Sequence, residues 1–314
     1  MYLGLVLKAT RLCNLRCTYC RDWREGPGQT MGFDVLARVV AAALREESHS
    51  IVDFVWHGGE TTLLPLSFYR KAMFLQSRFR RPGQRIGNVI QTNGTRLTPE
   101  WIRFLRDHRF AVGVSLDGPP EVHDRYRRYA GGRPSFETVL AGIRRLQEGR
   151  VPHSILLVVD EATLELGPDR LFDFFLELGS KDLSCLAATP VNAPGARPGT
   201  PAPHYVEPRR MNAFLARLYD RWLEHGDRSI RIRELVSIED RIRGAQGWSS
   251  CKLAGGCLGD FFIVEPDGDV AHCDLFVGDP DYTLGNVRTD DFWTMRRSIA
   301  MVRLRERNDA ALAR

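Results

Sequence analysis

The chain has 314 residues, of which 43% are hydrophobic and 26% are charged, as in an ordinary globular protein. Its 44 basic and 39 acidic residues leave a net charge of +5, which is too small and too scattered to indicate nucleic-acid binding. The sequence has no run of 18 apolar residues, and its first residues lack the charged leader and cleavage site of a signal peptide. We therefore expect a cytoplasmic protein without a membrane span.

Strand-like and helix-like segments alternate over the first 190 residues. Apolar runs rich in Val, Ile and Phe predict strands at 2–7, 51–56, 85–91, 110–115, 153–159 and 182–188. Amphipathic patterns predict helices at 34–47, 99–107, 136–147 and 169–178. This alternation predicts an α/β fold with parallel strands and right-handed crossovers. We expect a partial (β/α)6 TIM barrel with its active site at the carboxyl ends of the strands.

The pattern changes after residue 189, where prolines are frequent up to residue 208 and predict an irregular linker or a loop at the substrate mouth. Helices are predicted at 209–224 and near 233–243. A hairpin is predicted at 261–273, with Asp267 and Gly268 in its turn. We therefore divide the chain into a barrel at 1–190, a linker with bridging helices at 191–245, and a small C-terminal domain at 246–314.

Three of the seven cysteines lie close together after the first predicted strand. Cys13, Cys17 and Cys20 are spaced so that one loop can wrap around a cubane cluster, and thiolates are the ligands of iron–sulfur clusters. Three ligands leave one iron open to a small molecule. A structural zinc site would need a fourth ligand, and none is near in sequence. The spacing therefore favours an iron–sulfur cluster and leaves zinc as the alternative.

The segment 13–20 resembles the signature of the radical S-adenosylmethionine (SAM) superfamily, in which an aromatic residue such as Tyr19 precedes the last cysteine. The resemblance implies that the open iron binds SAM, which is cleaved reductively to methionine and a 5′-deoxyadenosyl radical. Three later strand ends also resemble the SAM-binding elements of this family, although Thr61 stands where the family usually has proline. Turn formation is the alternative role of these strand ends. The candidate SAM-binding residues are Tyr19, Gly58, Gly59, Glu60 (for the SAM ammonium), Gln91, Asn93, Ser115 and Asp117.

The second cysteine group, Cys251, Cys257 and Cys273, resembles the auxiliary-cluster region of SPASM/twitch radical SAM enzymes. Anaerobic sulfatase-maturating enzymes and related peptide maturases are the most similar subgroup. The resemblance implies at least one auxiliary [4Fe–4S] cluster, with a zinc knuckle or buried free thiols as the alternative. Its fourth ligand stays open between Cys185, a substrate atom and a residue after Arg314. A buried apolar thiol is the favoured interpretation of Cys185.

Asp274 directly follows Cys273 and matches an aspartate that is thought, in sulfatase maturases, to take a proton from the substrate. Beside an anionic cluster we expect its pKa to be raised, which would suit a catalytic base. An ordinary turn aspartate is the alternative.

The resemblance implies a peptide or protein substrate and a flavodoxin- or ferredoxin-type reductant. Two outcomes fit: oxidation of Ser or Cys to formylglycine, or a cyclophane-type crosslink in a ribosomally made peptide (RiPP). We favour the crosslink, because the linker and the C-terminal region differ from the sulfatase-directed pattern. The alternatives are dehydrogenation or epimerisation of a small sugar-like molecule, and a non-catalytic iron–sulfur or zinc protein.

Overall fold

The computed structural model describes residues 1–20, 22–23, 28–188, 206–244 and 257–312. Within these residues, one sheet runs in the order β10-β9-β8-β1-β2-β3-β4-β5-β6-β7. Neighbouring strands from β1 to β7 are parallel, and β8 is parallel to β1. The strands are β1 (Tyr2–Thr10), β2 (Ile51–Gly58), β3 (Arg85–Thr92), β4 (Ala111–Ser115), β5 (His153–Val159), β6 (Asp182–Ala187), β7 (Arg231–Ile232), β8 (Phe261–Val264), β9 (Asp269–Ala271) and β10 (Thr283–Asn286).

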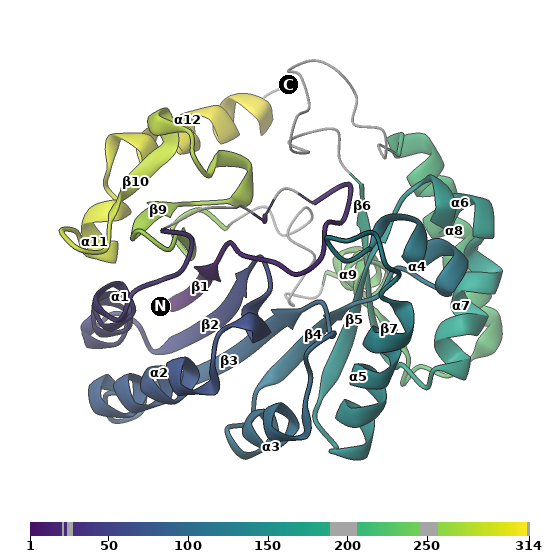
Figure 1. Cartoon of the computed structure of the whole chain (residues 1–314). Coiled ribbons are helices and arrows are strands. Elements are labelled where there is room, and N and C mark those ends of the chain that lie inside the picture. Colours follow the sequence, from purple (N-terminus) through teal and green to yellow (C-terminus); the bar gives the residue numbers. More distant parts are fainter. Residues whose placement is uncertain (21, 24–27, 189–205, 245–256, 313–314) are drawn as a thin grey trace.

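Helices cover the outer side of this curved sheet (Figure 1). Between successive strands from β1 to β6, the chain passes through at least one helix, so the predicted partial barrel is confirmed. The helices at 66–79, 120–126, 161–166, 292–295 and 299–312 were not predicted individually. The helices are α1 (Phe33–Arg45), α2 (Leu66–Phe79), α3 (Pro99–Asp107), α4 (Pro120–Tyr126), α5 (Phe136–Glu148), α6 (Glu161–Leu166), α7 (Pro168–Glu177), α8 (Pro208–His225), α9 (Arg233–Ile242), α11 (Phe292–Met295) and α12 (Ile299–Leu312).

Strand β1 shows how the sequence builds both the core and the site. Leu3, Leu5 and Leu7 are fully buried in the hydrophobic core, as expected for alternate residues that face the helices. Lys8 lies on the other face of the strand and is also fully buried. It is in register with His57 at the end of β2. The barrel interior therefore receives polar side chains near the carboxyl ends of these strands.

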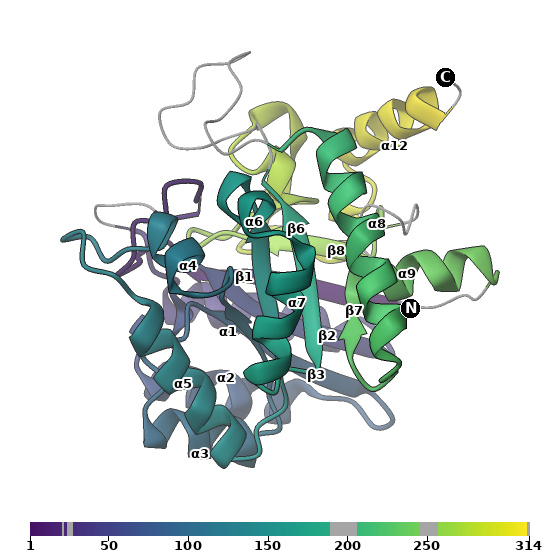
Figure 2. The same cartoon turned by 90° about the vertical axis from the view of Figure 1, so that its right-hand side faces the viewer.

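The predicted C-terminal hairpin is present, and it extends the barrel sheet. β8 pairs with β1, with Gly4 opposite Phe261, and β9 returns antiparallel to β8. Gly268 occupies the turn with φ of +98°, a conformation that favours glycine. Figure 2 shows β8 beside β1 from a second direction. β9 ends with Ala271 opposite Ile263 of β8, and the segment that follows brings Asp274 to Lys8 of β1.

Two boundaries of the predicted domains fall outside the described residues, namely those at residue 190 and at residue 246. Among the helices that the structure describes, none has the length and apolarity needed to cross a membrane.

Candidate active site

The loop after β1 carries the first three cysteines. Cys17 is 8% exposed, and Cys13 and Cys20 are half-buried. Backbone N–H groups point at two of the sulfurs: Leu15 N donates to Cys13 Sγ at 3.3 Å, and Asp22 N donates to Cys20 Sγ at 3.4 Å. Donors directed at sulfur are a feature of thiolates that bind an iron–sulfur cluster. The loop therefore has the donor set that a cluster needs.

The thiols of this loop influence one another. Burial is the main reason that the pKa values of Cys13 and Cys17 are raised to about 12, and the charge of the neighbouring Cys20 contributes to both shifts. Cluster binding must therefore displace protons from these thiols. Among the described residues, no three Cys, His, Asp or Glu side chains form a group that could hold a single metal ion. The fit to a cluster rests on three thiols in one loop that interact electrostatically and on the backbone donors to two of them.

Gly58 and Gly59 pack against the backbone that leads into the cysteine loop. A Cβ atom on Gly58, where φ is +129°, would lie 2.0 Å from Thr10 O. A Cβ on Gly59 would lie 2.2 Å from Leu12 O. Gly59 N also donates to Thr10 O at 2.7 Å. We expected these glycines to give SAM access to the backbone; in the structure their close approach is to the chain's own loop. A direct contact with SAM stays a prediction.

Glu60 is completely buried and ties β2 to β3. Its Oε1 accepts hydrogen bonds from Thr62 N at 2.9 Å and from Thr92 Oγ1 at 2.6 Å, while its Oε2 accepts from Asn93 N at 2.6 Å. Burial raises the pKa of Glu60, although these donors oppose the shift. The carboxylate therefore orders the strand ends, and its predicted contact with the SAM ammonium stays a prediction.

The other predicted strand-end residues meet beside the cysteine loop. Gln91 Nε2 donates to Ser115 Oγ at 3.1 Å, which links β3 to β4. Asn93 Nδ2 lies 3.8 Å from Cys13 Sγ and donates to Asn14 Oδ1 at 2.9 Å. The structure thus brings the predicted residues of three strand ends to one place, around the loop that would bind the cluster.

Asp117 joins the end of β4 to the cysteine loop. Its Oδ1 accepts a hydrogen bond from Val158 N at 3.0 Å, and its Oδ2 accepts from Arg127 Nε at 2.7 Å and from the hydroxyl of Tyr19. Arg127 Nη1 is 3.9 Å from Cys17 Sγ. Arg127 was not among the predicted site residues. Its signal in the sequence was its place in the segment 115–127, which also resembles the sulfatase-maturase subgroup.

A second set of charged residues lies between the two cysteine groups. Lys8 Nζ is 3.0 Å from Asp22 Oδ1, 2.9 Å from Asp274 Oδ1 and 3.2 Å from His57 Nδ1. Burial, together with the charge of Lys8, lowers the pKa of His57 to about 4, so this imidazole is neutral. Lys8 was not among the predicted site residues, although a lysine directly after an apolar strand was a visible signal.

Arg11 extends this charged set to the hairpin. Its Nη1 is 2.5 Å from Asp22 Oδ1, and its guanidinium also pairs with Glu265 at the end of β8. A buried arginine with two carboxylate partners fixes the relative position of the cysteine loop and the hairpin.

Asp274 lies beside a cation that was not among the predicted site residues. Among the chain's own groups, burial opposes ionisation of Asp274, but the adjacent ammonium of Lys8 outweighs it and lowers the pKa. The expected effect of a cluster on this pKa stays a prediction. The carboxylate is held ionised by a cation that the sequence analysis did not include. Asp274 is 37% exposed, so it keeps an accessible edge.

The second cysteine group is only partly described. Cys257 and Cys273 are half-buried, and Cys251 lies outside the described residues. Cys257 Sγ is 3.5 Å from His272 Nε2, and His272 Nδ1 is 3.1 Å from Phe261 O. Of the three predicted ligands of an auxiliary cluster, Cys257 and Cys273 are thus the two that the structure describes.

Cys185 lies inside β6 and is 3% exposed. Burial raises its pKa well above the usual value, and its backbone N–H donates to Glu234 Oε2 at 2.7 Å. This environment suits the buried thiol that we favoured over a cluster ligand.

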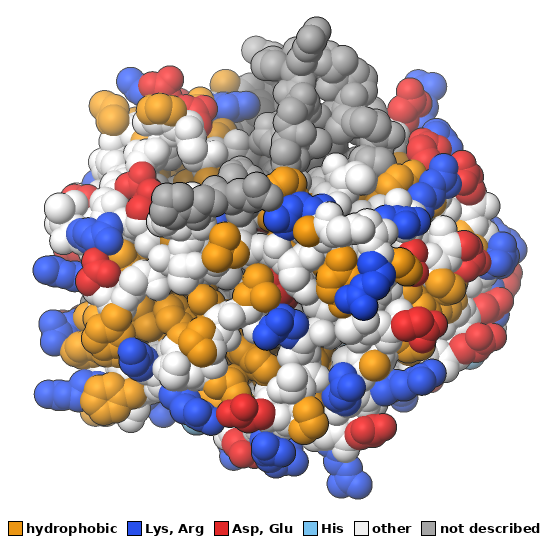
Figure 3. Space-filling model, in the orientation of Figure 1, with side chains coloured by type: hydrophobic (Ala, Val, Ile, Leu, Met, Phe, Trp, Pro, Cys, Tyr) orange, Lys and Arg blue, Asp and Glu red, His pale blue; other side chains and the backbone are white. Residues whose placement is uncertain are grey.

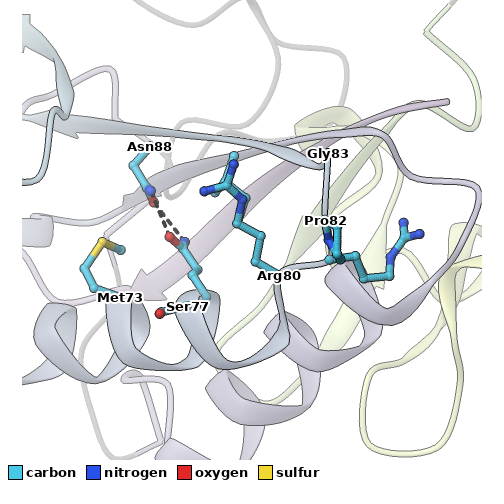
Figure 4. A pocket seen from close by; sticks show the side chains of 9 residues that line it. Met73, Ser77, Arg80, Pro82, Gly83 and Asn88 are labelled. Atoms are coloured by element: carbon cyan, nitrogen blue, oxygen red, sulfur yellow. Dashed lines mark hydrogen bonds between the residues drawn. The ribbon is translucent and has the colours of Figure 1, made fainter.

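A groove between α2 and β3 lies apart from these residues (Figure 4). In it, Gln76 and Asn88 exchange hydrogen bonds at 3.0 and 2.9 Å. Arg81 donates to the carbonyls of Leu44 and His49. These polar groups stabilise the fold and leave no reactive side chain in the groove. On the face drawn in Figure 3, acidic and basic side chains are interspersed.

Two family models match the chain. One, described as "Radical SAM superfamily", matches residues 7–165, and the other, described as "Iron-sulfur cluster-binding domain" (SPASM), matches residues 256–313. The first match includes the cysteine loop and the ends of β1 to β5. The second includes Cys257 and Cys273.

Known proteins resemble the chain over most of its length. The serine-type anaerobic sulfatase-maturating enzyme of Bacteroides thetaiotaomicron is 34% identical over 307 residues, covering 91% of this chain and 72% of that enzyme. The solved structure of anSMEcpe with bound AdoMet and the Cp18Cys peptide has a TM-score of 0.86 at 30% identity, covering 96% of this chain and 81% of that one. Streptococcus suis SuiB bound to its precursor peptide SuiA has a TM-score of 0.71 at 15% identity, covering 97% and 67%. At that identity the likeness to SuiB shows the fold alone.

Proposed function

This chain belongs to the radical SAM superfamily, and from that premise we propose that it oxidises a side chain of a peptide or protein substrate. It is a radical SAM enzyme of the SPASM subgroup, with a [4Fe–4S] cluster, SAM and auxiliary iron–sulfur chemistry as its cofactors. One observation carries the proposal. Buried Lys8 pairs with Asp22 beside the first cysteine group and with Asp274 beside the second, which supports a single site shared by both groups.

In this proposal the chain's residues hold the cofactors and move one proton. Cys13, Cys17 and Cys20 would hold the SAM-binding cluster, and Cys257 and Cys273 would contribute to an auxiliary cluster. When bound and reduced by a flavodoxin- or ferredoxin-type partner, the first cluster and SAM supply a 5′-deoxyadenosyl radical that removes a hydrogen atom. Asp274, kept ionised by Lys8, would accept the substrate proton at its exposed carboxylate edge.

The balance of this reaction is a two-electron oxidation. The substrate side chain gives up one hydrogen atom, one proton and one electron. A serine side chain becomes an aldehyde in this way. A cysteine side chain also exchanges its sulfur for an oxygen from water. The auxiliary cluster would supply an acceptor for the electron.

Similarity to known enzymes now favours formylglycine formation over the crosslink that we favoured from the sequence. Sulfatase-maturating enzymes resemble the chain at 28–34% identity, whereas SuiB resembles it at 15%. The part of the linker on which the preference for a crosslink partly rested, residues 189–205, lies outside the described residues. A peptide bound in the anSMEcpe structure supports a peptide over a sugar-like substrate. We therefore place a Ser or Cys peptide first and a crosslink second.

The test is anaerobic turnover of matched peptides that carry Ser, Cys or Ala at one position. Formylglycine formation predicts an aldehyde that reacts with a hydrazine probe, and a Ser peptide that loses two hydrogens. A crosslink predicts the same loss of hydrogens without an aldehyde. Turnover of an aminosugar but of no peptide would refute the proposal. Cys17→Ala should abolish 5′-deoxyadenosine formation, whereas Cys185→Ala, a buried thiol outside the site, should keep it.

A further inference from the structure

Arg127 places a buried positive charge beside a predicted cluster ligand. The residue is 7% exposed, and its Nη1 lies 3.9 Å from Cys17 Sγ, within hydrogen-bonding distance of sulfur. A different nitrogen, Nε, donates to Asp117 Oδ2 at 2.7 Å. The guanidinium therefore stands between the carboxylate and the sulfur in this hydrogen-bonded chain.

The position of this guanidinium is fixed from several sides. Asp117 is itself held by Val158 N of β5 and by the Tyr19 hydroxyl. The guanidinium carbon lies 5.3 Å from the centre of the Tyr19 ring, a cation–π arrangement. The Arg127 backbone is anchored as well, because its N–H donates to His123 O at 2.9 Å and its carbonyl accepts from Ser135 Oγ at 2.7 Å. Arginine is suited to such a place, since it stays charged and its planar fork can serve two partners at once.

A fixed cation at a ligand sulfur has a direct consequence for the cluster. The reduction potential of an iron–sulfur cluster depends on its net charge, on solvent exposure and on hydrogen bonds to its sulfurs. Reduction adds negative charge, and a nearby cation stabilises the more negative state. The effect is large where water is excluded, and here Cys17, Asp117 and Arg127 are all buried.

We propose that Arg127 is a positioning residue that raises the reduction potential of the SAM-binding cluster through its contact with Cys17 Sγ. This inference rests on the assignment of Cys17 as a ligand of that cluster. In this hydrogen-bonded series, Asp117 orients Arg127. Arg127 in turn makes the cluster easier for the protein reductant to reduce. The role thus lies in electron delivery before SAM cleavage and does not involve contact with the substrate.

The test is a redox titration, followed by electron paramagnetic resonance, of the full chain after anaerobic cluster reconstitution. The signal that changes on addition of SAM identifies the relevant cluster. Arg127→Gln should lower its midpoint potential, and Arg127→Lys, which keeps the charge but not the fork, should give an intermediate value. Arg125→Gln is the matched control, because Arg125 lies two residues earlier, in the last turn of α4, in an exposed pair with Glu165 at 2.8 Å. Its midpoint should equal that of the wild type.

Two results would overturn the inference. One is an Arg127→Gln protein that holds as much iron as the wild type and has the same midpoint potential. If the Arg127→Gln protein holds no cluster, the Arg127→Lys protein is titrated instead. The second result that would overturn the inference is a midpoint potential in Arg127→Lys equal to that of the wild type. Cys17→Ala tests the underlying assignment separately. If it keeps the SAM-responsive signal, Cys17 is not a ligand, whatever the Arg127 variants do.

Discussion

Lys8 Nζ lies 2.9 Å from Asp274 Oδ1, so a residue of the first strand holds the carboxylate that follows the auxiliary cysteine Cys273. The same ammonium pairs with Asp22, two residues after Cys20. Because Lys8 is fully buried, water does not compete for these contacts. The relative placement of the two cluster regions thus depends on Lys8 as well as on Arg11.

Replacing Lys8 with methionine should therefore uncouple SAM cleavage from product formation. Two carboxylates would lose their common partner, at a cost of about 3 kcal/mol in the free energy of unfolding. Asp274 would no longer be held in place, so the ratio of product to 5′-deoxyadenosine should fall. Denaturant unfolding and quantification of both products check this. Lys71→Met, on the exposed face of α2, should change neither quantity, and an unchanged ratio in Lys8→Met would contradict the role given to Lys8.

Gly58→Ala should disturb the cysteine loop more than an equivalent change elsewhere. The new Cβ would meet Thr10 O at 2.0 Å, in addition to the cost of a positive φ, which is about 1–2 kcal/mol. We expect the variant to hold less iron after reconstitution. Gly83→Ala is the control, because Gly83 also has a positive φ (+77°) but its Cβ would meet no atom within 4 Å. Equal iron content in the two variants would show that the close contact with Thr10 is unimportant.

The features that were predicted correctly are those that depend on residues close together in the sequence. Apolar runs and amphipathic periods marked the strands and helices of the barrel, and the turn at Asp267 and Gly268 marked the C-terminal hairpin. The first cysteine group was recognisable because all three residues lie within one loop. These signals need no knowledge of strand pairing.

The features that were missed depend on contacts between distant parts of the chain. Lys8 meets Asp274 only because β8 pairs with β1, and no local pattern specifies that pairing. Arg127 reaches Cys17, 110 residues earlier in the chain, only through the fold of the segment that follows β4. The packing of Gly58 against Thr10 of the adjacent strand was likewise not predicted. The sequence shows the type of each of these residues, but the fold determines which distant residue each one contacts.

Glu60→Gln should weaken the join between β2 and β3. The carboxylate accepts from Thr62 and Thr92 at one oxygen and from Asn93 N at the other. An amide can replace only one of these oxygens, because its NH2 group would face another donor. We expect a loss of about 1–3 kcal/mol in the free energy of unfolding and weaker SAM binding. Denaturant unfolding and SAM titration measure both, with the exposed Glu100→Gln as the control. A stability equal to that of the wild type would refute this role.

Asp160, the N-cap of α6, should make the stability of the protein depend on pH. Its Oδ1 accepts from Thr163 N at 3.0 Å, while its buried Oδ2 has no hydrogen-bond partner within the described residues, and burial raises its pKa to about 6. The folded state then binds a proton that the unfolded chain releases near pH 4, so stability should fall as pH rises from about 4 to 6 and level off above. Asp160→Asn keeps the cap without this titration. It should be more stable than the wild type at pH 7, by up to about 2–3 kcal/mol, and the difference should vanish towards pH 4. Urea unfolding of both proteins across this range measures the difference, and a pH-independent gap would show that Asp160 does not titrate in this way.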